Sequence, residues 1–306
     1  MMPHGWIILD KPVGLGSTQA VAAVKRNLRE AGFGKKVKVG HGGTLDPLAS
    51  GILPVAIGEA TKLTGRMLDA SKVYEFTVRF GEETDTLDLE GVVVAASDVR
   101  PSIAQVEAVL ARFTGTIEQV PPVYSALKVD GERAYDLARQ GVEVEMKSRV
   151  VTVFGLNVLS QPGQGEVLPE VTFRAFVSKG TYIRSLARDI AHALGTCGTV
   201  SMLRRTKAGP FDLSHAISLD KLNETGKGAP LEQILLPLEA GLDDIPAIDL
   251  DPEQARAVRQ GRVLTGMPHE DGLYCGYEGT LPVALVQLTD REVRVVRGFN
   301  LSDVAE

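Results

Sequence analysis

The sequence predicts an α+β fold built on a mixed β-sheet, and the hydrophobic periodicity of a few segments carries that prediction. Residues 73–81 alternate apolar and polar side chains, which is the pattern of a strand with one buried face. The apolar face carries Tyr74, Phe76, Val78 and Phe80. Residues 150–159 and 170–177 also have strand composition, whereas residues 103–113 have the spacing of an amphipathic helix. Helices interspersed with strands in this way indicate a sheet with helices packed on it.

A helix is expected near the amino terminus. Ser17 or Thr18 is a suitable capping residue, and Gly32 is a suitable stop. The apolar residues that recur at helical spacing between them are Val21, Val24 and Leu28.

A further helix is expected over residues 181–194, where Tyr182, Leu186 and Ile190 form an apolar stripe. Arg184 and Arg188 lie four residues apart on this helix, so two like charges share one face. We therefore expect an anionic group beside these arginines.

The chain changes character after about residue 210. Residues 231–238 are predicted to be helical, and residues 241–246 have the composition of a domain boundary. A short helix over 254–261 and strands at 283–288 and 293–296 follow. We expect a small β-rich module from about residue 245 to residue 306.

Length and composition restrict the class of protein. A chain of 306 residues with 44% hydrophobic and 24% charged residues is expected to form one large domain, alone or with a small one. It has no apolar run of about 20 residues and no secretory signal, so we expect a cytoplasmic protein. Its two cysteines and five histidines lack the spacing of a metal site. No metal and no cofactor are predicted.

The net charge of -6 hides two basic clusters. Residues 24–41 contain six Lys or Arg against one Glu, and residues 178–209 contain six against one Asp. Such clusters are either solvated faces or phosphate-binding surfaces. They occur on both sides of the glycine-rich segment at residues 40–51, which favours a binding role.

That segment reads Gly40-His41-Gly42-Gly43-Thr44-Leu45-Asp46-Pro47-Leu48-Ala49-Ser50-Gly51. Its glycines permit the close approach of another molecule, and Pro47 keeps Asp46 out of helical geometry. Asp46 is therefore a candidate catalytic acid held in a turn. An Asp-Pro pair that only starts a turn would look the same.

The segment closely resembles the catalytic motif of the TruB family of pseudouridine synthases. Further blocks match that family in order over residues 5 to about 210. They are Leu9-Asp10-Lys11-Pro12, Tyr74, Thr84-Asp85-Thr86, Pro122-Val123-Tyr124-Ser125-Ala126-Leu127-Lys128, Lys179-Gly180-Thr181-Tyr182-Ile183-Arg184 and Leu203-Arg204-Arg205.

The resemblance implies a largely antiparallel sheet in a catalytic domain over residues 1–244. Residues 124–150 would be an inserted segment that clamps RNA, and residues 245–306 would be a PUA-like RNA-binding domain. The implied activity is isomerisation of the uridine at position 55 in the T loop of tRNA. The implied partner is the tRNA T stem-loop, bound by a monomer with no obligatory protein partner.

The resemblance also implies roles for single residues. Asp46 matches the essential aspartate, Arg184 its arginine partner, and Tyr74 the tyrosine that stacks on the target base. His41 matches the histidine that fills the place of the flipped base, and Leu203 the apolar floor of the pocket. The other implied substrate-binding or supporting residues are Lys11, Gly43, Lys179, Tyr182, Arg204 and Arg205.

Two alternatives remain at this point. A related synthase works with a guide RNA on ribosomal RNA inside a protein complex, although the segment at 124–150 favours a stand-alone enzyme. A non-catalytic RNA-binding or tRNA-folding protein is the other alternative, and it would not require Asp46, Tyr74 and Arg184 together.

Overall fold

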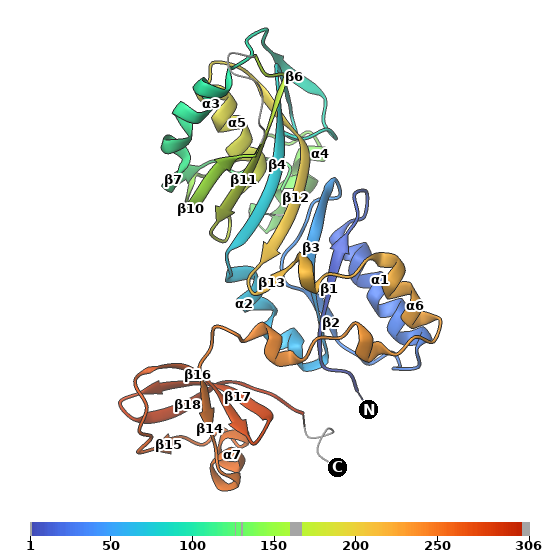
Figure 1. The fold of residues 1–306 in the computed structure, drawn as a ribbon, viewed down its shortest axis with the longest axis vertical. Helices are drawn as coiled ribbons and strands as arrows, with labels where there is room; N and C mark the ends of the chain where they lie inside the picture. The colour runs from blue at the N-terminus through green and yellow to red at the C-terminus, as the bar shows by residue number, and fades with distance from the viewer. Residues whose placement is uncertain (1, 126, 130, 160–166, 302–306) are drawn as a thin grey trace.

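The structure is a computed structural model that describes residues 2–301 apart from residues 126, 130 and 160–166. A long mixed sheet runs through its larger part (Figure 1). The order of the main strands is β1-β3-β12-β4-β11-β10-β7. They span Gly5–Lys11, Ala49–Ile57, Gly198–Ala208, Lys72–Phe80, Glu170–Val177, Arg149–Val158 and Gly115–Gln119. Two short strands, β2 (Val39–His41) and β13 (Phe211–Asp212), pair with β3 and β12.

β3 and β12 run parallel, and the other pairs of described strands in this sheet run antiparallel. The predicted α+β class with a mixed, largely antiparallel sheet is therefore confirmed. The predicted strand at 170–177 has the predicted bounds, and that at 73–81 is shifted by one residue.

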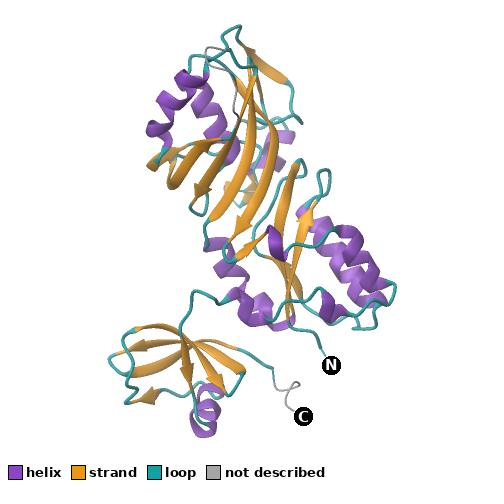
Figure 2. Ribbon diagram, viewed as in Figure 1, coloured by secondary structure: helices purple, strands orange, loops and turns teal. Residues whose placement is uncertain are grey.

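Helices cover the two halves of the sheet separately (Figure 2). α3 (Ile103–Leu110) and α5 (Ile183–Ala193) pack on β4, β10, β11 and β12 over a core that includes Phe76 and Phe173, whose rings lie 5.2 Å apart. α1 (Ser17–Glu30) and α6 (Leu219–Gly226) lie beside each other against the β1 and β3 half. α1 is capped by Gly16, one residue earlier than expected, and ends before Gly32 as predicted.

The prediction of a helix over residues 231–238 is wrong. One 3₁₀ turn spans Leu231–Gln233, and the chain then extends until a second 3₁₀ turn at Leu238–Gly241. Leu236 exchanges two backbone hydrogen bonds of 2.8 Å with Trp6 in β1. Pairing with the edge of β1 satisfies backbone groups that a helix would have satisfied internally.

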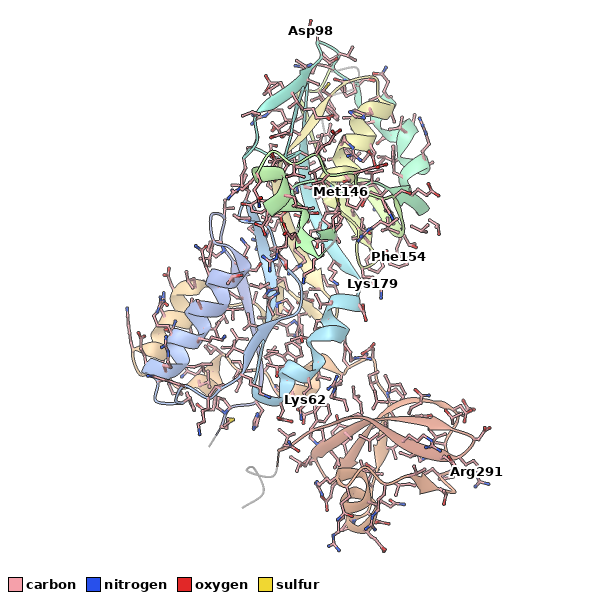
Figure 3. All side chains as sticks on the ribbon, turned by 180° about the vertical axis from the view of Figure 1, so that it is seen from behind. Lys62, Asp98, Met146, Phe154, Lys179 and Arg291 are labelled. Atoms are coloured by element: carbon pink, nitrogen blue, oxygen red, sulfur yellow. The ribbon has the colours of Figure 1, made fainter. Side chains whose placement is uncertain are left out.

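The carboxyl-terminal residues form a separate β-rich unit, as predicted (Figure 1). Its strands are β14 (Ala247–Asp249), β15 (Leu264–Thr265), β16 (Gly272–Glu278), β17 (Leu281–Thr289) and β18 (Glu292–Gly298), with α7 (Pro252–Arg259) beside them. Figure 3 labels Lys62 where this unit meets the rest of the chain, and its Nζ donates to the carbonyl of Gly298 over 2.8 Å. The exact boundary at residue 245 remains a prediction.

Between residues 124 and 150 the chain leaves the sheet. This segment contains a hairpin of two short strands, β8 (Lys128–Val129) and β9 (Glu132–Arg133), and the short helix α4 (Ala134–Arg139). The remaining described helix, α2 (Thr64–Asp69), follows a 3₁₀ turn at Gly58–Leu63. None of the helices in the described part of the chain is long and apolar enough to cross a membrane.

We expect the change Gly51→Ala to destabilise the fold strongly. Gly51 has a φ of +99°, and a Cβ there would lie 2.1 Å from the carbonyl oxygen of Arg205 in β12. The loss should be about 3 kcal/mol or more, measured by urea unfolding. Gly141→Ala is the control, because its φ is +75° but a Cβ meets nothing within 4 Å. That variant should lose only about 1 kcal/mol, and equal losses would refute the close approach of β3 and β12.

Candidate active site

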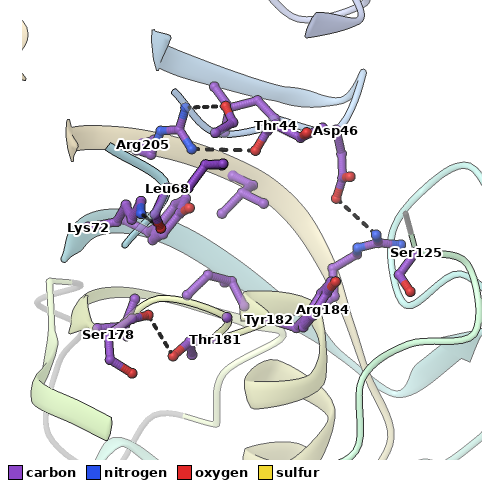
Figure 4. A pocket seen from close by; sticks show the side chains of 17 residues that line it. Thr44, Asp46, Leu68, Lys72, Ser125, Ser178, Thr181, Tyr182, Arg184 and Arg205 are labelled. Carbon is purple, nitrogen blue, oxygen red and sulfur yellow. Dashed lines mark hydrogen bonds and ion pairs between the residues drawn. The ribbon is translucent and has the colours of Figure 1, made fainter. Parts of the chain in front are cut away.

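Three neighbouring strands and the start of one helix surround a cavity of about 270 Å³. In the register of the sheet, Tyr74 on β4 lies opposite Arg205 on β12, and Arg205 lies opposite Gly51 on β3. The loop that precedes β3 carries Asp46, and α5 brings Arg184 to the cavity from the other side (Figure 4). The cavity is thus lined by segments far apart in the sequence.

Asp46 and Arg184 form an ion pair across this cavity. Asp46 Oδ2 lies 2.9 Å from Arg184 Nη2, and the aspartate side chain is 40% exposed whereas that of the arginine is 7% exposed. The structure therefore brings together the two residues that the sequence pairs. A guanidinium at this distance orients the carboxylate by a charge-assisted hydrogen bond.

Arg184 is itself held by three other groups. Nη1 lies 3.3 Å from Oδ2 of the buried Asp88 and donates to the carbonyl of Thr86 over 2.8 Å. Nη2 donates to the carbonyl of Tyr124 over 2.9 Å. The expected anionic neighbour of Arg184 is thus a pair of carboxylates, while Arg188 pairs with Asp189.

The loop that carries Asp46 is anchored from below by buried side chains. Ser17 Oγ donates to the carbonyl of Leu45 over 2.9 Å and accepts from its N–H over 2.8 Å. Lys11 is fully buried, and its Nζ donates to the carbonyls of Leu15 and Pro47 over 2.6 and 3.3 Å. Lys11 therefore supports the loop, and a contact of Lys11 with substrate stays a prediction. The sequence suggested only a helix cap for Ser17.

Arg205 is a buried cation at the cavity whose donors are directed at backbone carbonyls. It is fully buried, and it donates to the carbonyls of Ile52, Gly43 and Thr44 over 2.7, 3.1 and 3.4 Å. Its guanidinium is thus occupied by the backbone of the catalytic loop and of β3. The side chain holds the loop through these bonds and also lines the cavity, and its contact with substrate stays a prediction.

Aromatic and apolar side chains form the walls of the cavity. Tyr74, Leu203 and Tyr182 all line it and are half-buried. Gln119 fixes the start of α5, because its amide accepts from the N–H of Tyr182 over 2.8 Å and donates to its carbonyl over 3.1 Å. Burial raises the pKa of the Tyr182 hydroxyl, and the nearby Ser125 hydroxyl acts in the opposite direction. Nothing in the sequence pointed to Gln119.

His41 and Gly43 lie at the start of the loop that carries Asp46. Gly43 lines the cavity with a φ of +135°, whereas His41 is not among its lining residues. His41 Nδ1 accepts from the N–H of Gly43 over 3.3 Å. Burial and the nearby Arg205 lower the pKa of His41. Both effects favour the neutral form of the ring.

Most cations of the cluster at 178–209 have carboxylate partners. Lys179 lies 2.9 Å from Asp69, with both side chains exposed. Arg204 makes a two-pronged pair with Asp10 at 2.8 and 3.0 Å. The exposed pair of Lys179 leaves it available to an anion, because such pairs contribute little. Arg204 is more firmly engaged.

Lys72 is a further buried cation on the cavity wall. Its Nζ donates to the carbonyls of Met67, Leu68 and Ala70 over 2.9, 2.7 and 2.6 Å. These carbonyls lie at the end of α2, where backbone acceptors lack helical partners. Burial lowers the pKa of Lys72 to about 8, and the positive charge of Arg205 acts in the same direction.

Comparison with known families now tests the resemblance. Residues 29–183 match the TruB family pseudouridylate synthase (N terminal domain), and residues 184–243 match the tRNA pseudouridylate synthase B C-terminal domain. The chain belongs to the TruB family. The predicted family and enzyme class, an isomerase that forms pseudouridine, are confirmed.

Relatives resemble this member of the TruB family over their full length. A tRNA pseudouridine synthase B of Novosphingobium aromaticivorans is 70% identical over 305 residues, which cover 100% of both chains. The protein of the same name from Zymomonas mobilis is 59% identical over 298 residues, which cover 97% of this chain and 96% of that one.

Solved structures share the fold. A Cbf5-Nop10-Gar1 complex matches with a TM-score of 0.72 at 28% identity, covering 98% of this chain and 86% of that one. An H/ACA RNP bound to a substrate RNA containing 2'-deoxyuridine matches with a TM-score of 0.71 at 26% identity and the same coverage. A coverage of 98% extends the likeness into the carboxyl-terminal unit.

We expect Arg205→Lys to lose stability and turnover but to keep RNA affinity. A lysine carries its three donors on one nitrogen, so it cannot reach the carbonyls that the separate Nε, Nη1 and Nη2 atoms of Arg205 reach, and unfolding should become easier by about 2 to 3 kcal/mol. RNA affinity should stay within about twofold, because no phosphate contact is removed. Arg204→Lys is the matched control, with a loss of about 1 kcal/mol or less for a partly exposed pair. A tenfold loss of affinity in Arg205→Lys with unchanged stability would support the predicted RNA contact.

Lys72 should give the protein a pH-dependent stability. Because its pKa is lower in the folded chain than in the unfolded one, the unfolded chain binds more protons between about pH 8 and pH 10.5. The free energy of unfolding therefore rises with pH in that window, by about 1 kcal/mol per pH unit. Burial also lowers the pKa of Lys11 to about 8, which adds a second rise in the same window. Lys72→Arg stays charged, so it should keep the Lys11 contribution and lose that of Lys72 in urea unfolding from pH 7 to pH 10. Parallel profiles for the two proteins would contradict the assignment.

Proposed function

We propose that this protein isomerises uridine to pseudouridine at position 55 in the T loop of tRNA. The observation that carries the proposal is the Asp46–Arg184 pair, which faces a cavity walled by Tyr74 and Leu203. The names of the relatives that cover the whole chain support tRNA as the substrate.

The reaction rearranges one bond without a net change of atoms. The bond between uracil N1 and the ribose breaks, the base turns, and a bond forms between C5 and the same ribose carbon. The proton that C5 loses is balanced by the proton that N1 gains. Asp46 serves as nucleophile towards the base or the sugar, or as the base that removes a ribose proton. In each case Arg184 holds the carboxylate in place through the ion pair.

The target base has to leave its stack before Asp46 can act on it. The cavity of about 270 Å³ offers it a place, with Tyr74 as the stacking wall and Leu203 as the floor. Tyr182 closes the side next to α5. We assign the neutral ring of His41 to the space that the base leaves, because an uncharged ring stacks without taking part in the chemistry.

The segment at 124–150 supports an enzyme that works without partner proteins. Its first residues adjoin the site, since the carbonyl of Tyr124 accepts from Arg184. A segment linked in this way to the catalytic arginine is suited to clamp RNA over the cavity. The solved relatives include complexes with other proteins and with RNA, so a guide-dependent enzyme is the alternative outcome of the test below.

We expect Asp46→Asn to abolish isomerisation while tRNA binding is kept within about tenfold, because binding depends on phosphate contacts elsewhere. Pseudouridine would be mapped in an unmodified tRNA transcript before and after treatment with purified protein. Asp244→Asn is the matched control, since Asp244 is 69% exposed and pairs with Arg66.

Three results would contradict the proposal. Full activity of Asp46→Asn would remove the catalytic assignment, and modification only in the presence of a guide RNA would favour the guide-dependent enzyme. Pseudouridine at another position would refute the target.

A further inference from the structure

A second hollow, of about 300 Å³, lies apart from the active-site cavity. Lys25 and Arg29 of α1 and Lys35 of the following loop line it, and its apolar floor consists of Leu28, Val37 and Val39. No lining residue is shared with the catalytic cavity. The family match begins only at residue 29, within this hollow.

The local fold gathers these cations. Lys25 and Arg29 are four residues apart and therefore lie on one face of α1. Gly32 and Gly34, with φ of +88° and +76°, then turn the chain back, and the buried Val37 fixes the returning segment. Lys35 is thereby brought to the side chains that precede it by six and ten residues.

The side chains of the cations at this place have no ion-pair or hydrogen-bond partner among the described residues. The described part of the chain contains no ion pair or side-chain hydrogen bond to the exposed residues Lys25, Arg29, Lys35, Lys36 and Lys38. In this respect they differ from Lys179 and Arg204, which have aspartate partners. Unpaired like charges held close together repel one another, and a polyanion relieves that repulsion.

The distance from the loop that carries Asp46 to the hollow follows from the lengths of α1 and β3. α1 begins at Ser17, which is bonded to Leu45, and Arg29 follows 12 residues later, which is about 18 Å along a helix. β3 gives the same result. Ile52 of β3 and Gly43 of the loop both accept hydrogen bonds from Arg205, so Ile52 lies beside the loop. Ile57, at the other end of β3, pairs with Val39 of the hollow. Five residues of strand span about 17 Å.

This separation equals about six base pairs of an A-form RNA helix, which rises roughly 2.8 Å per base pair. The hollow is also at the end of β3 where the carboxyl-terminal unit attaches. Gly58 donates to the carbonyl of Lys38 over 2.8 Å, and Asn300 of that unit donates to Glu59 over 2.7 Å. An RNA helix whose loop enters the cavity has to extend over this separation to reach the hollow.

We propose that the hollow binds phosphates of the RNA helix that carries the target loop, at about six base pairs or more from that loop. The inference rests on the proposed function, since it takes the nucleotide in the catalytic cavity as its starting point. It revises the use of the cluster at 24–41: these cations bind the distal helix, and the groups around Asp46 bind the loop.

The test uses two hairpins with the same T loop and stems of four and ten base pairs. Wild type should bind the longer hairpin about tenfold more tightly at 0.1 M salt, a gain expected from a few phosphate contacts. The triple variant Lys25→Gln, Arg29→Gln, Lys35→Gln should lose that gain. The slope of log affinity against log salt for the longer hairpin should fall by about 2 to 3, since each lost contact removes about 0.9.

The matched control changes three exposed cations outside the hollow, Arg79→Gln, Arg112→Gln and Lys227→Gln, and gives the same change of net charge. It should keep the preference for the longer hairpin. A preference that survives in the triple variant, or an equal loss in the control, would overturn the inference. Equal loss on both hairpins would place the hollow at the loop and overturn it as well. Wild-type protein that binds hairpins but forms no pseudouridine in tRNA would instead refute the proposed function.

Discussion

The site depends on one buried guanidinium that is shared by two carboxylates. Arg184 is 7% exposed and lies between Asp46 and Asp88, with the carbonyls of Thr86 and Tyr124 as further acceptors. A buried cation without such partners would be unstable. Asp88 and the two carbonyls therefore hold the guanidinium even when Asp46 is engaged with a substrate. Asp46, which is partly exposed, is the one partner of this set that can exchange a contact with Arg184 for one with RNA.

The same principle explains the rigid support under the loop. Lys11, Lys72 and Arg205 are buried cations whose donors are aimed at backbone carbonyls. Lys11 is bonded to the loop before α1, Lys72 to the end of α2 and Arg205 to the loop before β3. These segments lie outside the strands of the sheet. Charge-assisted hydrogen bonds to carbonyls are stronger than neutral ones. A loop rich in glycine is thus fixed by its surroundings, and its glycines serve for close approach rather than for mobility.

The sequence predicted those features that depend on local pattern or on a family motif. Alternation located β4, strand composition located β11, and the motif located Asp46 and its partner Arg184. It could not predict which long polar side chains turn inward, because Arg204 and Arg205 are neighbours in sequence and only their opposite directions on β12 separate them. Ser17 and Gln119 were missed for a related reason. Their partners Leu45 and Tyr182 are distant in the chain, and no periodicity records such contacts.

The pairing of charges is more informative here than their number. Both basic clusters have six cations, and sequence alone treats them alike. In the structure most cations of the cluster at 178–209 have partners: Arg184, Arg188 and Arg204 have carboxylates and Arg205 has carbonyls. The cluster at 24–41 is at the surface around Lys25, Arg29 and Lys35. A net charge of -6 is compatible with RNA binding under these conditions, because the cations that contribute to counterion release are those without an internal partner.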